Sequence, residues 1–265
     1  RNLAEGYDRI DSVTRVLKKY IIYVIPRVNP DATEFYFNKP AYFRTLNSRA
    51  LDLDKDGTVS EDHYDDLNND GVITLMRVKD VSGTWIQDAD HPELLRKAVS
   101  ERNEIGEYLL YSEGIDNDKD GAWNEDENGG VNFNQNFTYR YRYFQKGSGF
   151  HQISEPMTRA VADFAFEHKN IAAIFTFSPN DNLLHPWKSK SGNSSSDRGQ
   201  PITNVLPEDE IYLNRLAEQF KATTFLADSP EPDRGNGSFA EWAYYHYSRW
   251  SLSVPAWWPP GLAER

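Results

Sequence analysis

Apolar positions near the start of the chain first follow a helical period and then form an uninterrupted run. Between Asp8 and Tyr20 the apolar side chains recur three and four residues apart, at Ile10, Val13, Val16 and Leu17. This spacing predicts an amphipathic helix. The run YIIYVI, from Tyr20 to Ile25, ends at Pro26. An apolar run of this length, stopped by proline, predicts a buried strand.

Helical and extended patterns alternate again in the second half of the chain. The segment SEPMTRAVADFAFEHK offers Ser154 as N-cap and Pro156 in the first turn, and PEDEIYLNRLAEQFKA predicts another helix. The run IAAIFTF, Ile171 to Phe177, predicts a fully buried strand, and WSLSVPAWW predicts the last strand. Helices alternating with apolar strands indicate an α/β layer fold with a largely parallel central sheet.

Composition narrows the class of protein. The 265 residues suffice for one large domain, and the aromatic content of 14% means that the core relies on large rings. We interpret residues 1–265 as a single domain, and as a fragment of a longer protein because the chain opens on a loop and ends in PPGLAER after a core-like strand. The formal net charge of −12 disfavours nucleic acid as a partner. There is no cysteine, no signal peptide and no run of the roughly eighteen apolar residues that cross a bilayer.

The acidic residues concentrate in a polar insertion that we place at residues 51–130. Between Asp52 and Asp70 lie seven aspartates and Glu61, with Lys55 as the one fixed positive charge. A stretch of this density is either a solvated tract or a cation site.

Three loops in this insertion share the pattern D-x-[DN]-x-D-G. Alternate side chains at positions one, three and five converge on a hard cation, glycine at six allows the sharp turn, and position seven donates a carbonyl. The predicted ligands are Asp52, Asp54, Asp56 and Thr58 in the first loop, Asp66, Asn68, Asp70 and Val72 in the second, and Asp116, Asp118, Asp120 and Ala122 in the third.

The closing ligand at position twelve differs between the loops, which hold His63, Arg77 and Glu127 there. Glu127 completes the third loop, whereas Asp62 or Asp65 could close the first and an acidic residue from elsewhere in the chain could close the second. Only two residues separate the first two loops, which leaves no room for a helix. Paired helix–loop–helix EF-hands are therefore excluded, and the pattern is typical of back-to-back calcium loops in extracellular proteins. We expect calcium as the bound ion.

Five segments, in order, resemble the zinc carboxypeptidase family typified by carboxypeptidase A. They are YVIPRVNPDATEFYF, GGVNFNQNF, SEPMTRAV, GSFAEWAYYHY and SLSVPAWW. The aspartate loops fall where a bacterial subgroup of the family carries a similar insertion, which includes VITLMRVKD here. The resemblance implies a three-layer α/β/α fold with a mixed, largely parallel sheet, and a secreted or cell-envelope setting.

The family's catalytic groups are missing from the matching positions. No H-x-x-E occurs in the chain, so this zinc motif either precedes Arg1 or does not exist. The second zinc histidine corresponds to Phe177 or Ser178, and the general-base glutamate corresponds to Pro255. Of the pair that binds the substrate carboxylate, Asn134 is retained and the arginine has become Gln135. Tyr244 matches the mobile tyrosine of the family.

These losses predict a calcium-stabilised domain that has lost catalysis. We expect no zinc. The domain would act as a peptide-binding or structural subunit of an extracytoplasmic assembly, with a peptide or protein partner. Lone histidines such as His151, His185 and His246 are more often structural than catalytic.

The rival hypothesis is an active zinc metallocarboxypeptidase with an upstream H-x-x-E. A third is a carbohydrate-binding module that uses YRYRYFQ and WAYYHYSRW, although packing explains these aromatic runs better.

Overall fold

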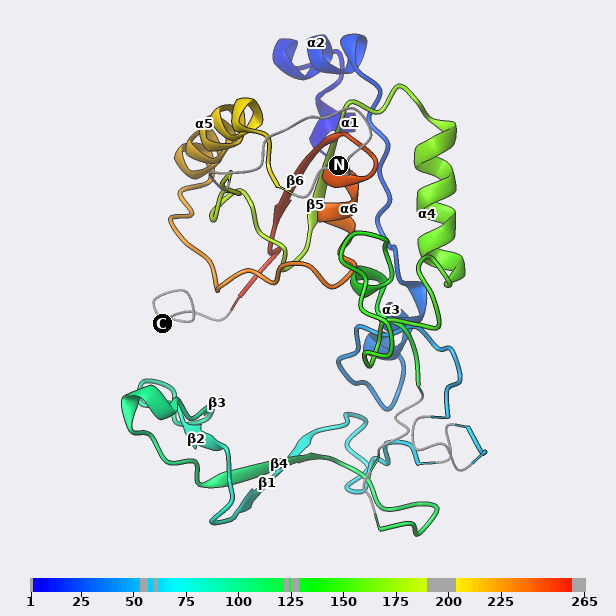
Figure 1. Cartoon of the computed structure of the whole chain (residues 1–265), viewed down its shortest axis with the longest axis vertical. Coiled ribbons are helices and arrows are strands. Elements are labelled where there is room, and N and C mark those ends of the chain that lie inside the picture. The colour runs from blue at the N-terminus through cyan, green and yellow to red at the C-terminus, as the bar shows by residue number, and fades with distance from the viewer. Residues whose placement is uncertain are drawn as a thin grey trace.

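The computed structural model describes residues 2–52, 57–59, 62–121, 124, 129–189 and 204–258 (Figure 1). Within this part of the chain there are six α-helices, two 3₁₀ turns and six strands. The helices are α1 (Asn2–Gly6), α2 (Asp11–Lys19), α3 (Pro30–Phe37), α4 (Pro156–Glu167), α5 (Pro207–Thr224) and α6 (Phe239–Tyr245). The 3₁₀ turns are η1 (Ser100–Arg102) and η2 (Phe133–Gln135). None of the described helices is long and apolar enough to cross a membrane.

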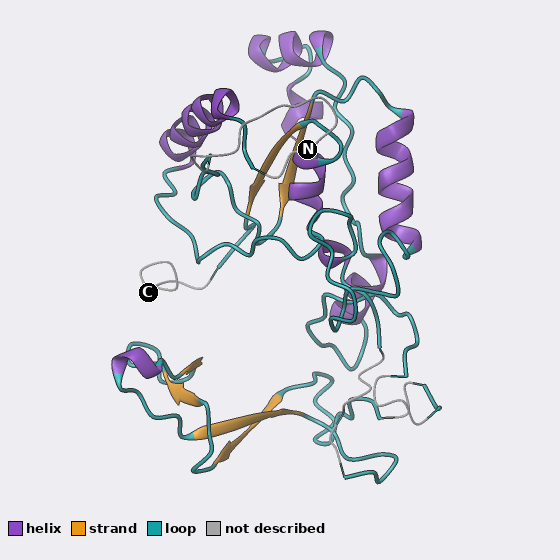
Figure 2. Cartoon of the chain, in the orientation of Figure 1, coloured by secondary structure: helices purple, strands orange, loops and turns teal. Residues whose placement is uncertain are grey.

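The strands form two separate sheets (Figure 2). Strands β1 (Leu75–Lys79), β2 (Trp85–Gln87), β3 (Leu95–Lys97) and β4 (Tyr108–Ser112) form an antiparallel sheet in the order β1-β4-β2-β3. Strands β5 (Ala173–Phe177) and β6 (Trp250–Val254) form a parallel pair. The antiparallel sheet and η1 lie in a lobe of their own, set apart from the α-helices and from the parallel pair (Figure 1).

Helix starts follow local capping chemistry. Asn29 accepts the Ala32 N–H at 3.1 Å ahead of α3, and Ser238 accepts the Glu241 N–H at 3.3 Å ahead of α6. Proline opens α3, α4 and α5, where its missing N–H costs no hydrogen bond. The N-cap of α4 is Glu155, one residue beyond the expected Ser154.

Helices pack against both faces of the parallel pair, although β5 stays partly exposed. Ile174 of β5 packs against a core cluster that includes residues of α4 and α6, and Ser251 of β6 donates its hydroxyl to Ala240 of α6 at 2.7 Å. Side chains alternate across a strand. Leu252 accordingly faces the other way and packs with the cluster around Leu213 of α5.

Aromatic rings dominate the core. Phe137 is fully buried, its ring centroid 5.1 Å from that of Trp242, and Trp242 stacks on Tyr247 at 5.4 Å. Tyr139 is buried and stacks on Tyr245 at 4.1 Å. The packing explanation is confirmed for Tyr139, Trp242, Tyr245 and Tyr247, whereas Tyr143 and Phe144 of the first run are exposed.

The predicted fold class is wrong. The parallel sheet has two strands rather than a large central set, and the larger sheet is antiparallel and lies elsewhere, so the chain is not a three-layer α/β/α carboxypeptidase fold. The predicted strand Tyr20–Ile25 is coil. The physical reason is that an apolar run indicates burial without specifying the neighbouring strand to which it hydrogen-bonds.

Two further details differ from expectation. Strand β5 is not fully buried, because its side chains alternate in exposure and Phe177 is 67% exposed. The insertion at 51–130, taken as a polar excursion, contains the whole antiparallel sheet. Its strands are three to five residues long and none of their residues is buried, so their periodicity is weak.

Candidate functional sites

The three aspartate loops share one internal contact. The glycine N–H at position six donates to the aspartate at position one, at 3.1 Å from Gly57 to Asp52, 2.8 Å from Gly71 to Asp66 and 3.1 Å from Gly121 to Asp116. The glycine φ angles are 102°, 83° and 95°, in the left-handed region that favours glycine. The repeated sequence pattern therefore produces a repeated local structure.

The second loop is internally cross-linked. The Asp70 N–H donates to Asn68 Oδ1 at 2.8 Å and to Asp66 Oδ1 at 3.1 Å, and the Val72 N–H donates to Asp70 Oδ1 at 2.9 Å. Val72 also forms a parallel bridge with Ala41. The side chains at positions one, three and five thus lie around one short turn.

The third loop brings three carboxylates close together. One oxygen from each of Asp116, Asp118 and Asp120 lies within 4.8 Å of the others. Although the N–H of Asp120 lowers the pKa of Asp118, burial and the neighbouring carboxylates raise it, and the net pKa is above the ordinary value. Oxygens that share one calcium at roughly 2.3–2.6 Å are at most about 5 Å apart. The donor set and its spacing fit calcium.

The loops are held against one another. Asp62, which is fully buried, accepts the N–H of Asn117 at 2.7 Å, and Asp65 accepts the side-chain amide of Asn117 at 2.9 Å. A bridge between Tyr64 and Gly114 runs beside these contacts. The end of the first loop therefore lies against the start of the third loop.

Glu113 joins the second and third loops, a role that we did not predict. Its carboxylate accepts the N–H of Leu67 at 2.9 Å, and the N–H and hydroxyl of Thr74 at 3.0 and 2.8 Å. Hydrogen bonds from Thr74 hold the pKa of Glu113 below its ordinary value despite burial. A glutamate three residues before an aspartate loop was the available sequence signal.

Part of the predicted ligand set cannot be placed. Asp54, Asp56, Ala122 and Glu127 lie outside the described residues. Thr58 is exposed beside Gly57.

Four of the predicted cleft residues lie on one groove of about 630 Å³. They are Asn134, Gln135, Phe177 and Ser178. Turn η2 supplies the two amides, and the end of β5 supplies the other two residues. The groove's further lining includes Pro26 to Asn29, part of α3, and Pro179 and Asn180.

A network of amides forms the floor of the groove. Asn134 donates its side-chain amide to Asn180 Oδ1 and accepts the N–H of Phe239 at 3.0 Å. Ser178 donates its hydroxyl to the same Asn180 oxygen at 2.8 Å, and Asn180 donates to the carbonyl of Asp233 at 2.8 Å. Ser178 is thus a structural hydroxyl, at one of the two positions, Phe177 and Ser178, where the resemblance predicts the second zinc histidine.

The rim of the groove is aromatic. Tyr36, Phe37, Phe43 and Phe177 line it and are exposed. Among the described residues that line the groove, Asp233 is the one acidic side chain, and there is no histidine, glutamate or cysteine. The groove is therefore lined by amides, aromatic rings and the two arginines Arg27 and Arg44.

Tyr244 and Pro255 do not line this groove. Tyr244 is buried, donates its hydroxyl to Asp209 at 2.7 Å and accepts the N–H of Leu206 at 3.2 Å. Burial raises the pKa of Tyr244 far above its ordinary value. Pro255 follows the end of β6, where Ser178 donates its N–H to Val254 at 3.0 Å, so these two positions are near neighbours.

The three histidines considered as substitutes lie outside the groove lining. His185 contacts the carbonyl of Ser229 at 2.9 Å, and His246 contacts the Thr138 hydroxyl at 2.6 Å. Burial lowers the pKa of His246. His151 contacts the carbonyl of its neighbour Gln152 at 2.9 Å.

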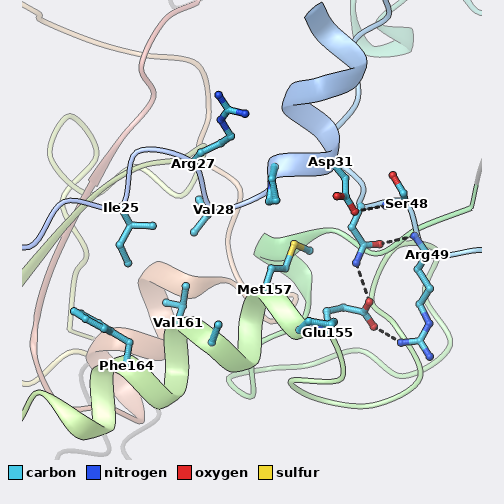
Figure 3. Close-up of a pocket in the computed structure, with 14 residues that line it drawn as sticks. Ile25, Arg27, Val28, Asp31, Ser48, Arg49, Glu155, Met157, Val161 and Phe164 are labelled. Carbon is cyan, nitrogen blue, oxygen red and sulfur yellow. Dashed lines mark hydrogen bonds and ion pairs between the residues drawn. The ribbon is translucent and has the colours of Figure 1, made fainter. Parts of the chain in front are cut away.

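A second pocket of about 780 Å³ lies next to the groove and shares Arg27 and Val28 with it (Figure 3). Its wall is apolar, with Met157, Val161 and Phe164 of α4. At its polar end the buried Glu155 accepts from Arg49 at 2.7 Å and from the Asn47 amide at 2.8 Å. These contacts join the chain around residues 47–49 to the start of α4.

Comparisons of the chain with protein-family models, with curated proteins and with solved structures found no match. The resemblance to the zinc carboxypeptidases therefore stays a prediction from the sequence motifs.

Proposed function

We propose that the protein is a calcium-stabilised, non-catalytic domain that binds an extended polypeptide segment in the aromatic groove. The observation that carries the proposal is the position of Asn134, Gln135, Phe177 and Ser178 on one groove. Of the groove-lining side chains in the described part of the chain, Asp233 alone could act as a base, and peptide hydrolysis needs an activated water as well as a general base.

Peptide is the ligand class that suits this lining. Asparagine and glutamine side chains both donate and accept, and so complement the N–H and C=O groups of a peptide backbone. The exposed aromatic rings at the rim offer apolar contact area for side chains.

Calcium is the second part of the proposal. Asp116, Asp118 and Asp120 would hold the ion in the third loop, and Asp66, Asn68 and Asp70 would hold one in the second. The ion would neutralise carboxylates that otherwise repel one another and would fix the loops that lead into β1 and out of β4. Weak to moderate affinity suits the millimolar calcium outside cells, which supports an extracytoplasmic location.

A single experiment separates this proposal from the rival metallocarboxypeptidase. The purified protein is supplied with equimolar zinc and an N-blocked dipeptide that ends in phenylalanine, and free phenylalanine is measured. We expect no release above a zinc-only control, together with binding of fluorescein-labelled peptides by anisotropy. Zinc-dependent release of phenylalanine would overturn the non-catalytic assignment, and no binding by any peptide would overturn the peptide-binding function.

A further inference from the structure

Glu113 joins the second aspartate loop to the third loop with both of its carboxylate oxygens. Its Oε1 atom accepts the N–H of Leu67 at 2.9 Å and the N–H of Asn68 at 3.3 Å. Its Oε2 atom accepts the N–H and the hydroxyl of Thr74 at 3.0 and 2.8 Å. An ionised carboxylate offers about four acceptor positions, and these four hydrogen bonds fill them. The buried Glu113 is therefore a joint between the loops and not a calcium ligand.

The partners of Glu113 belong to both arms of the second loop. Leu67 and Asn68 hold positions two and three, on the incoming arm, and Asn68 is also a proposed ligand. Thr74 holds position nine, on the outgoing arm, and its carbonyl accepts the N–H of Glu113 at 2.9 Å. One carboxylate can reach both arms only while they lie close together, which is the arrangement that an ion at the centre of the loop requires.

The residues on either side of Glu113 contact the third loop. Asn124 holds position nine of that loop and donates its side-chain amide to the Ser112 hydroxyl at 2.9 Å and to the Ser112 carbonyl at 3.2 Å. Gly114 lies so close to the same side chain that a β-carbon added there would be 2.3 Å from Asn124 Oδ1. Position nine of each loop is therefore fixed to one stretch, residues 112–114.

The start of the third loop is held against the same stretch. Two residues separate Glu113 from Asp116, the first proposed ligand of that loop. The residue after Asp116, Asn117, donates its N–H to the buried Asp62 at 2.7 Å. Because this connection is short and is held at its far end, a shift of Glu113 also moves Asp116.

We propose that Glu113 is a positioning residue that couples calcium binding in the second and third loops, so that an ion in either loop raises the calcium affinity of the other. The inference rests on the proposed calcium function and adds the regulation of that site. Without an ion, the carboxylates of each loop repel one another and favour an open loop. An ion in one loop closes it and fixes residues 112–114, so that closing the other loop costs less conformational entropy. By linkage the effect is the same in both directions.

Nuclear magnetic resonance can follow each loop separately. The Gly71 N–H donates to Asp66 in the second loop at 2.8 Å, so its shift reports whether that loop is filled. The Gly121 N–H donates to Asp116 at 3.1 Å and reports on the third loop in the same way. Calcium titrations of the full chain compare the parent with two double variants, Asp66→Ala with Asp70→Ala and Asp116→Ala with Asp120→Ala. We expect the weaker of the two loops to need about fivefold less calcium in the parent than in the variant that lacks the other loop.

Glu113→Gln tests the joint itself and leaves every proposed ligand in place. The glutamine keeps one carbonyl oxygen but replaces the other acceptor by an amino group, so at least one arm of the second loop loses its hydrogen bonds. With Glu113→Gln added to the parent and to both loop variants, we expect the difference in calcium requirement to fall below about twofold. A merely structural role would lower the melting temperature and leave that difference unchanged. Glu107→Gln, at an exposed glutamate of the same lobe, is the matched control and should keep the difference.

The outcomes separate the coupling from the calcium function. If neither glycine amide of the parent shifts on adding calcium, the proposed calcium function is wrong. If each loop fills at the same calcium concentration with and without the other, calcium binds but the coupling is wrong. A difference that survives in Glu113→Gln would contradict the role of Glu113. The comparison of the parent with the two loop variants does not depend on how well Glu113→Gln folds.

Discussion

The side-chain amide of Asn182 bridges the carbonyl of Ser251 and the N–H of Ser253, both at 2.8 Å, and so stands in for a third strand beside β6. Asn182→Ala should leave these buried backbone groups without partners and lower the free energy of unfolding by about 1–3 kcal/mol. Urea denaturation measures the change. Asp163→Ala, at an exposed position of α4, serves as the control and should change it by less than about 0.5 kcal/mol. Equal effects of the two substitutions would contradict the bridging role.

Two phenylalanines should respond in opposite ways to truncation. Phe137 is fully buried among aromatic rings, so Phe137→Ala should lower the free energy of unfolding by about 3–5 kcal/mol. Phe177 is 67% exposed on the groove, so Phe177→Ala should leave the stability nearly unchanged and weaken peptide binding. Denaturation and anisotropy measure the two effects. A large loss of stability in Phe177→Ala would show that the ring is structural.

The sequence could predict only part of this structure. Local features were predictable, because capping residues, proline and helical periodicity act within a few residues: the helices at α2, α4 and α5 were all expected. The aspartate loops were predictable for the same reason, since Gly71 and Asp66 are only five residues apart.

Long-range pairing was not predictable in the same way. The runs Tyr20–Ile25 and Ile171–Phe177 look alike in sequence, yet only the second contains a paired strand, because pairing depends on residues more than seventy positions away. Glu113 was missed because its partners, Leu67 and Thr74, lie about forty positions earlier. The cleft positions Asn134 and Ser178 came from motif order, and a groove lined by both is found although the predicted fold class is wrong.

An ion pair in the antiparallel lobe predicts a dependence of stability on pH. Arg96 donates two hydrogen bonds to Glu104, at 2.5 and 2.7 Å, and these bonds, with the Val99 N–H, lower the pKa of Glu104 to about 2. Because the folded-state pKa is depressed, the pair contributes stability above pH 4.5, and this contribution is lost as the pH falls through about 2.

Arg96→Gln should therefore lower the melting temperature at pH 7 and have little effect near pH 2. It should also move the pKa of Glu104, followed by NMR titration, up toward the ordinary 4.5. Lys79→Gln, which removes an exposed ion pair with Glu107, is a matched control that should change stability little. An unchanged Glu104 titration in Arg96→Gln would contradict the assigned cause.

Calcium should stabilise the folded chain through the third loop. An ion that binds only the folded state adds about 2.7 kcal/mol when its concentration is a hundred times the dissociation constant. The double substitution Asp116→Ala and Asp120→Ala removes two of three clustered carboxylates and should abolish the rise in melting temperature on adding calcium. Asp163→Ala should retain that rise. Without calcium, the double substitution relieves the like-charge repulsion around Asp118. Losing these two charges should therefore not destabilise the variant when calcium is absent. If adding calcium leaves the melting temperature of the parent protein unchanged, the proposed calcium site is wrong.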